Sequence, residues 1–305
     1  MTKTPREIAD GVWFLRTLMV NLYIVRTERA WVLVDTGLPG YAPAIRKAAA
    51  EVLGTSQPPA AIVLTHGHFD HVGSLEALLD GWAVPVFAHV LEGPYLTGRS
   101  SYPPPDPLAG GGAMSLLSRL YPRGPIDVSD RLHVLPGGGH VPYLDGWRWI
   151  ATPGHSPGHV SLFRDSDRTL ISGDAAITVQ QESVLAVATQ RREMHGPPAY
   201  FTADWGAAGD SVGHLAALNA ELLAPGHGEP LGGEAMREGL RALAAHFADQ
   251  EVPSIGRYAL QPAITDESGV VSLPPDPLPK LAAGVAIAAG LTYALALRRR
   301  RTARV

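Results

Sequence analysis

The segment at residues 65–73, THGHFDHVG, packs four strong metal-ligand side chains into six positions: His66, His68, Asp70 and His71. Imidazole nitrogens and a carboxylate are ligands suited to zinc, iron or manganese. Gly67 and Gly73 flank these ligands and let the backbone fold tightly around an ion. A polar loop with ordinary surface histidines would contain the same residue types, so this segment alone leaves both interpretations open.

Three more segments have the same character, a metal-ligand residue among glycines directly after an apolar strand. They are TPGHSPGH with His155 and His159, SGDA with Asp174, and APGHG with His227. Strand ends at one edge of a sheet sandwich converge in space, so ligands far apart in sequence can meet there. The recurrence in four segments favours one shared metal site over four unrelated polar loops.

The order HxHxDH, then His, then Asp, then His resembles the metallo-β-lactamase superfamily over roughly residues 10–250. This resemblance implies a fold of the α/β (α+β) class, a four-layer αββα metallo-β-lactamase sandwich. The metals would lie at one edge, between the two sheets.

Matched motif to motif, the resemblance implies two metal sites. His66, His68 and His155 would hold the first metal, Asp70, His71 and His227 the second, and Asp174 would bridge both. We expect two Zn²⁺ per chain, with Mn²⁺ or Fe²⁺ as alternatives. Two metals about 4 Å apart share a hydroxide and clamp a reacting carbonyl or phosphoryl group. Asp70 and Asp174 are the expected catalytic residues, with Asp70 orienting the hydroxide and handling its proton.

Two further residues are expected to support the ligands without binding metal. Asp35 ends the strand of the LVDTG segment, where a carboxylate can hold the remote N–H of a ligand histidine and fix its tautomer. A turn cap is the other interpretation of Asp35. His159 belongs to a matched segment and is expected to brace the loop.

Composition restricts the chemistry and the partners. The chain has no cysteine, which excludes disulfides, a cysteine nucleophile and thiolate zinc sites. Residues 280–305 hold six of the 25 Lys and Arg residues and none of the 29 Asp and Glu residues, so residues 1–279 carry a net charge of −10. An acidic body is a poor partner for a phosphate backbone, so we expect a small-molecule substrate and no nucleic acid.

The apolar pattern predicts short strands alternating with a few helices. Expected strands include 12–15, 21–26, 31–34, 61–64, 85–88, 132–135, 147–151, 160–164, 169–171 and 222–224. Expected helices are 41–53, 74–79, 205–219 and 234–250, with Asp204 as an N-cap. The opening metal-ligand segment then lies at a strand-to-loop junction.

We predict three parts along the chain. Residues 1–250 would form the catalytic domain, in which the Pro- and Gly-rich stretch 93–131 is interpreted as a lid. Residues 251–279 are proline-rich and predict an irregular linker. Residues 280–305 would form a membrane-associated helix with a basic tail.

The last part contains 17 uncharged residues, 281–297, between Lys280 and four arginines. Such a run is roughly 25 Å long as a helix, at the lower limit for a membrane span. We therefore expect a transmembrane or interfacial helix and membrane association through it. If the helix instead docks on the domain, the protein is cytoplasmic.

Within the superfamily, the sequence points to the hydrolysis of a small carbonyl ester, thioester or lactone, as in glyoxalase II and the acyl-homoserine lactonases. The absence of cysteine and the presence of Asp174 argue against true β-lactamases. The alternatives are a mononuclear iron enzyme similar to persulfide dioxygenases, a phosphodiesterase or nuclease of the same fold, and a non-catalytic binding protein. The complete set of seven ligands weighs against the mononuclear iron enzyme and against the non-catalytic binding protein.

Overall fold

The structure is a computed structural model that describes residues 4–279. Its contacts divide the chain into a compact unit, Met1–Leu273, and a second unit, Pro274–Val305. All helices and strands discussed below belong to the first unit.

The first sheet has seven strands that follow one another in chain order. They are β1 (Arg6–Ala9), β2 (Val12–Thr17), β3 (Val20–Arg26), β4 (Trp31–Val34), β5 (Ala61–Val63), β6 (Val86–Ala88) and β7 (Leu132–Val134). Strands β1 to β4 pair antiparallel, and β4 to β7 pair parallel. Helices α1 (Ala42–Leu53), α2 (Phe69–Val72) and α3 (Leu75–Leu79) connect the first parallel strands.

The second sheet has five strands in the order β12-β11-β10-β9-β8. They are β8 (Trp147–Ala151), β9 (Val160–Arg164), β10 (Thr169–Gly173), β11 (Leu222–Pro225) and β12 (Leu231–Gly232). Only β10 and β11 pair parallel. Their connection contains α6 (Val184–Thr189), the short turn η3 (Ala199–Phe201) and α7 (Trp205–Ala217), and α8 (Glu234–Gln250) follows β12.

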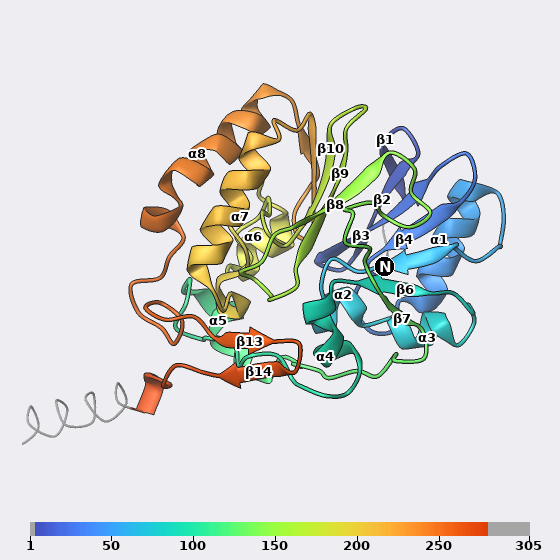
Figure 1. The fold of residues 1–305 in the computed structure, drawn as a ribbon. Coiled ribbons are helices and arrows are strands. Elements are labelled where there is room, and N and C mark those ends of the chain that lie inside the picture. The colour runs from blue at the N-terminus through green and yellow to red at the C-terminus, as the bar shows by residue number, and fades with distance from the viewer. Residues whose placement is uncertain (1–3, 280–305) are drawn as a thin grey trace, which may run out of the picture. The chain divides into compact units, whose positions relative to one another are not determined.

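Three apolar layers hold the sheets and helices together. In β2, Val12 and Phe14 pack between the two sheets, whereas Trp13 and Leu15 pack outward on the layer that contains α1 and α3. This division follows from the two-residue period of a strand. A third layer joins the second sheet to α7 and α8. The result is the predicted four-layer αββα sandwich, with α1 and α3 on one outer side and α7 and α8 on the other (Figure 1).

Most regular elements match the sequence-based prediction. The strands Trp31–Val34, Trp147–Ala151 and Val160–Arg164 and the helix Glu234–Gln250 have the predicted bounds. Asp204 is the predicted N-cap, since its side chain accepts the backbone N–H of Ala207 at 3.0 Å. The prediction missed short elements such as β1, β12 and α2.

The stretch expected to be a lid lies between β6 and β7. It begins after the turn η1 (Val90–Glu92) and contains α4 (Gly93–Leu96), α5 (Gly112–Leu117) and the turn η2 (Ser118–Leu120). Most of the remaining residues are irregular, as the Pro and Gly content predicts.

The stretch expected to be an irregular linker differs from the prediction. It contains a hairpin of β13 (Ile264–Asp266) and β14 (Gly269–Ser272). Tyr258 is buried, and its hydroxyl donates to the carbonyl of Pro104 at 2.7 Å. The buried ring explains why residues 251–273 belong to the compact unit.

The expected transmembrane helix requires a correction. Across residues 4–279, no helix is both long enough and apolar enough to cross a bilayer. The run 281–297 that motivated the expectation lies outside the described residues.

Candidate metal centre

The seven predicted ligands gather at the edge where strands of both sheets end. His66 and His68 follow β5, and His155 lies between β8 and β9. The others are Asp70 and His71 on α2, Asp174 after β10 and His227 after β11. All are buried, with Asp70 the most exposed at 8%. So many buried ionisable groups in one place need either one another or a cation as partners.

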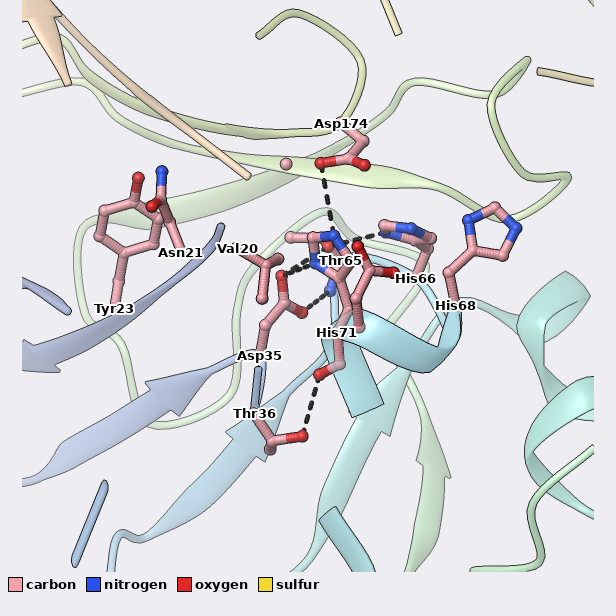
Figure 2. A network of polar contacts seen from close by, with 12 residues as sticks. Val20, Asn21, Tyr23, Asp35, Thr36, Thr65, His66, His68, His71 and Asp174 are labelled. Atoms are coloured by element: carbon pink, nitrogen blue, oxygen red, sulfur yellow. Dashed lines mark hydrogen bonds and ion pairs between the residues drawn. The ribbon is translucent and has the colours of Figure 1, made fainter. Parts of the chain in front are cut away.

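The ligand atoms form three groups, within each of which they lie no more than 4.8 Å apart. The groups are His66, His68 and His155; Asp70, His71 and His227; and His66, His71 and Asp174. Asp174 lies between the first two groups, with Oδ2 at 3.4 Å from His155 Nε2 and 3.1 Å from His227 Nε2. Its Oδ1 lies 3.4 Å from His71 Nε2 (Figure 2). The geometry thus brings together all seven residues predicted from sequence.

Unpartnered atoms show that the cluster suits a cation. Among the described residues, His66 Nε2, His71 Nε2, His155 Nδ1 and Asp174 Oδ1 are buried without a hydrogen-bond partner. Buried polar atoms in proteins nearly always have one. Gly226 lies directly against the Asp174 carboxylate. A side chain at position 226 would collide with Asp174 Oδ1, so only glycine fits there. The donor set and the missing partners fit a divalent metal.

The electrostatics separate the histidines into two kinds. Burial lowers the pKa of His66 and His155 well below the ordinary value, and neighbouring imidazoles lower it further. Burial also lowers the pKa of His227, but Asp174 and Asp70 outweigh it and raise that pKa to about 10. The carboxylates likewise raise the pKa of His71 well above its ordinary value despite its burial. The raised pKa values of His71 and His227 favour a proton on these rings beside the carboxylates, so a cation bound there would compete with protons.

Asp35 holds one ligand histidine in a fixed orientation. Its Oδ2 lies 2.9 Å from His71 Nδ1, and its two oxygens accept the backbone N–H and the hydroxyl of Thr65, each at 2.8 Å. These contacts leave His71 Nε2 directed at Asp174 (Figure 2). Asp35 has a φ of 60°, a left-handed conformation that Asp tolerates better than most residues. The contact between Asp35 and His71 Nδ1 is the one that a tautomer-fixing role of Asp35 would require.

His159 and Met19 support the other side of the cluster. His159 Nε2 accepts the backbone N–H of Asp174 at 2.9 Å, and its Nδ1 lies 2.8 Å from the Thr152 hydroxyl. His227 Nδ1 lies 2.9 Å from the carbonyl oxygen of Met19, which leaves Nε2 facing Asp70 and Asp174. His159 thus connects its own loop to the loop of Asp174 through these two contacts.

Sequence reasoning missed two buried residues beside the first histidines, Glu92 and Tyr102. Glu92 accepts hydrogen bonds from Gly67, Ser156 and Gly158 and from the hydroxyl of Tyr102. The only signal was an acid in the otherwise apolar stretch HVLEGPYL, directly after a predicted strand.

Aromatic side chains from distant segments cover the cluster on the side of His68. The Phe201 ring stacks on the His68 imidazole with centroids 4.8 Å apart. Tyr121, from the expected lid, lies 5.7 Å from Phe69 and 6.1 Å from Phe201, centroid to centroid. The Phe201 ring contributes to the burial of His68, which is 4% exposed, and Tyr121 packs against Phe201.

An apolar groove of about 360 Å³ lies nearby. Its lining comes from the end of β2, the β2–β3 turn, α5, α6 and the residue that caps α6. It comprises Arg16, Leu18, Met19, Met114, Val184, Val187, Ala188 and Gln190. Met19 joins the groove to His227 through its carbonyl oxygen. Met114 joins it to Tyr121, whose hydroxyl lies 3.5 Å from the Met114 sulfur. The groove therefore contacts the metal cluster through Met19 and the aromatic cover of the cluster through Met114.

The fold and the cluster together define a metal-dependent hydrolase of the sandwich type, and comparison with known proteins agrees. Residues 15–227 match the metallo-beta-lactamase superfamily, and the chain belongs to that family. It is 47% identical over 241 residues to the probable metallo-hydrolase YflN of Bacillus subtilis (strain 168), covering 78% of this chain and 91% of that protein. It is 30% identical over 212 residues to the probable metallo-hydrolase YybB of the same strain, covering 70% of this chain and 82% of that protein.

A solved structure supports the fold. The BLEG-1 B3 metallo-beta-lactamase aligns with a TM-score of 0.50 and 24% sequence identity, covering 76% of this chain and 94% of that one. At this identity the likeness concerns the fold. The family match and the two curated relatives identify the chain as a metallo-hydrolase of the metallo-beta-lactamase superfamily.

Proposed function

We propose that the protein is a dinuclear metal-dependent hydrolase that attacks a small carbonyl ester, thioester or lactone. The observation that carries the proposal is the position of Asp174 between two three-residue ligand groups. One carboxylate that faces both groups suits a pair of ions better than a single one. Two Zn²⁺ are the proposed ions, with Mn²⁺ or Fe²⁺ as alternatives.

His66, His68 and His155 would hold the first ion, and Asp70, His71 and His227 the second. Bound there, two divalent cations would polarise a scissile carbonyl and lower the pKa of water to near neutrality. Asp70 is the most exposed of the seven ligands, at 8%. We therefore assign to a carboxylate oxygen of Asp70 the orientation of the attacking water and the acceptance of its proton.

The chain's remaining features favour a neutral, partly apolar substrate. The groove beside Met19 suits the apolar part of an ester or thioester, and the rings of Tyr121 and Phe201 keep water from the reacting carbonyl. The net charge of −10 on residues 1–279 disfavours a polyanionic substrate such as nucleic acid.

Elemental analysis of the full chain, purified without added metal, tests the proposal together with hydrolysis of a panel of esters, thioesters, lactones and phosphodiesters. We expect close to two zinc or manganese ions per chain, and turnover that Asp174→Ala abolishes. One iron per chain with no hydrolysis would overturn the proposal in favour of a persulfide-oxidising enzyme. Turnover of phosphodiesters alone would replace the carbonyl substrate with a phosphoryl one.

A further inference from the structure

We propose that Glu92 is a positioning residue that holds together the two loops carrying the first-site histidines. The inference rests on the proposed function, because it concerns the site of His66, His68 and His155. Glu92 is fully buried and follows β6 in the turn η1. A fully buried carboxylate is costly unless hydrogen bonds satisfy both of its oxygens.

Four donors surround this carboxylate. Oε2 accepts the backbone N–H of Gly67 at 2.9 Å and the hydroxyl of Tyr102. Oε1 accepts the hydroxyl of Ser156 and the backbone N–H of Gly158, each at 2.8 Å. Both oxygens are thus satisfied, each by two hydrogen bonds.

The donors lie directly beside the ligands. Gly67 separates His66 from His68, and Ser156 follows His155. The first loop leaves β5 of one sheet, and the second joins β8 to β9 of the other sheet. One side chain therefore ties the ligand loops across the two sheets, which fixes the separation of the three imidazoles.

The motif glycines fit this interpretation. A Cβ on Gly67 would lie 2.6 Å from the Tyr102 hydroxyl oxygen, and a Cβ on Gly158 would lie 2.8 Å from the Glu92 backbone nitrogen. Neither glycine has a positive φ. The close approach of Tyr102 and Glu92, rather than backbone freedom around an ion, explains why both positions are glycine.

The second site is held by other groups. His71 is oriented by Asp35 and His227 by Met19. The four hydrogen bonds of Glu92 reach none of these residues. Replacing Glu92 should therefore weaken metal binding at the first site and leave the second unchanged, which a general loss of folding would not do.

The test uses Zn²⁺ affinity, measured by competition with a chromophoric chelator in two backgrounds. His227→Ala removes a second-site ligand and keeps the first site, and His68→Ala does the reverse. Glu92→Gln replaces one carboxylate oxygen with an amide N–H₂ group, which cannot accept the two hydrogen bonds that this oxygen accepts. We expect zinc binding to weaken about 10- to 100-fold in the His227→Ala background and to stay unchanged in the His68→Ala background.

Glu182→Gln is the matched control. Glu182 is also buried and accepts the backbone N–H of Ala199 at 2.7 Å, without a hydrogen bond to any ligand loop. We expect this variant to keep zinc affinity in both backgrounds. Equal weakening of both sites by Glu92→Gln, or no weakening at either site, would overturn the inference.

Two milder variants keep the test decisive if Glu92→Gln does not fold. Tyr102→Phe and Ser156→Ala each remove one hydroxyl donor, and the Tyr102 ring stays stacked on Tyr95 at 3.9 Å between centroids. Each should weaken the first site by a smaller factor, and no change in either would overturn the inference. Zinc affinity is read without substrate, so failure of the hydrolysis panel is distinguishable from failure of this inference.

Discussion

At the scale of single residues, Asp35 contacts the expected ligand His71 and would affect metal binding by orienting that histidine. Asp35→Asn keeps the size but loses one acceptor, so either Thr65 or His71 loses its partner. We expect second-site zinc affinity in the His68→Ala background to fall about 10- to 100-fold. Asp165→Asn, at an exposed position, is the control and should bind zinc normally. Unchanged affinity in Asp35→Asn would mean that the backbone alone orients His71.

His159 gives a pH-dependent prediction. Burial lowers the pKa of His159 to about 3, whereas an unfolded histidine titrates near 6.5. Between these values the unfolded chain binds the extra proton, so the metal-free protein should lose stability as the pH falls from about 6.5 to 3.

Urea denaturation across this range checks the contribution of His159. His159→Gln retains an acceptor for the Asp174 N–H but no titrating group. It should reduce the slope of stability against pH by about 1.4 kcal/mol per pH unit, the value for one proton. An unchanged slope would assign the acid sensitivity to the other buried histidines.

The candidate site could be predicted from sequence as far as its ligands are distinctive residue types in glycine-rich segments. All seven meet in space because strand ends converge at one edge of the sandwich. Glu92 and Tyr102 could not be found this way, because their role depends on contacts with backbone N–H groups from two other loops. Periodicity and motif spacing carry no information about such contacts.

At the scale of secondary structure, the N-cap of α7 gives a simple stability test. Asp204→Ala removes the acceptor for the Ala207 N–H and should lower the free energy of unfolding by about 1 kcal/mol. Urea denaturation measures the change. Asp210→Ala, at an exposed position within the same helix, is the control. A loss no larger than that of the control would show that α7 does not depend on this cap.

The groove between the β2–β3 turn and α6 gives a specificity test. Val187→Asp places a charge on its apolar lining. We expect KM for an octanoyl ester to rise about tenfold, the value of roughly two buried methylene groups, while KM for an acetyl ester changes little. Val271→Asp, at an exposed position on β14, is the control. Equal changes for both esters would exclude the groove as the acyl-chain site.

Helices and strands were predicted correctly where the length of a segment and its apolar pattern indicate the same type of element, as in Trp147–Ala151 and Glu234–Gln250. The missed elements β1, β12 and α2 have only two to four residues and lack a continuous apolar run, so neither a period nor composition reveals them. The helical turn α2 is an example. Three of its four residues, Phe69–His71, belong to the ligand cluster or its aromatic cover, so they show no apolar pattern typical of a packed helix.

At the scale of the molecule, the end of the compact unit can be tested by truncation. A chain ending at Leu273 should unfold at the same urea concentration as the full chain, because the compact unit ends there. A chain ending at Gln250 loses the buried Tyr258 ring and its bond to Pro104, and should be less stable by about 2 kcal/mol or more. Equal stability of the two truncated chains would restore the linker interpretation of residues 251–273.

The division of the ligands between two sheets has a consequence for folding. His66 and His71 come from the first sheet and Asp174 and His227 from the second, so the cluster forms only after the sheets have packed against each other. An ion then recognises the folded chain and not its fragments. At a free ion concentration 100 times the Kd, each occupied site adds about 2.7 kcal/mol to the stability. Metal supply would therefore set how long the chain survives against proteolysis, in addition to whether it can react.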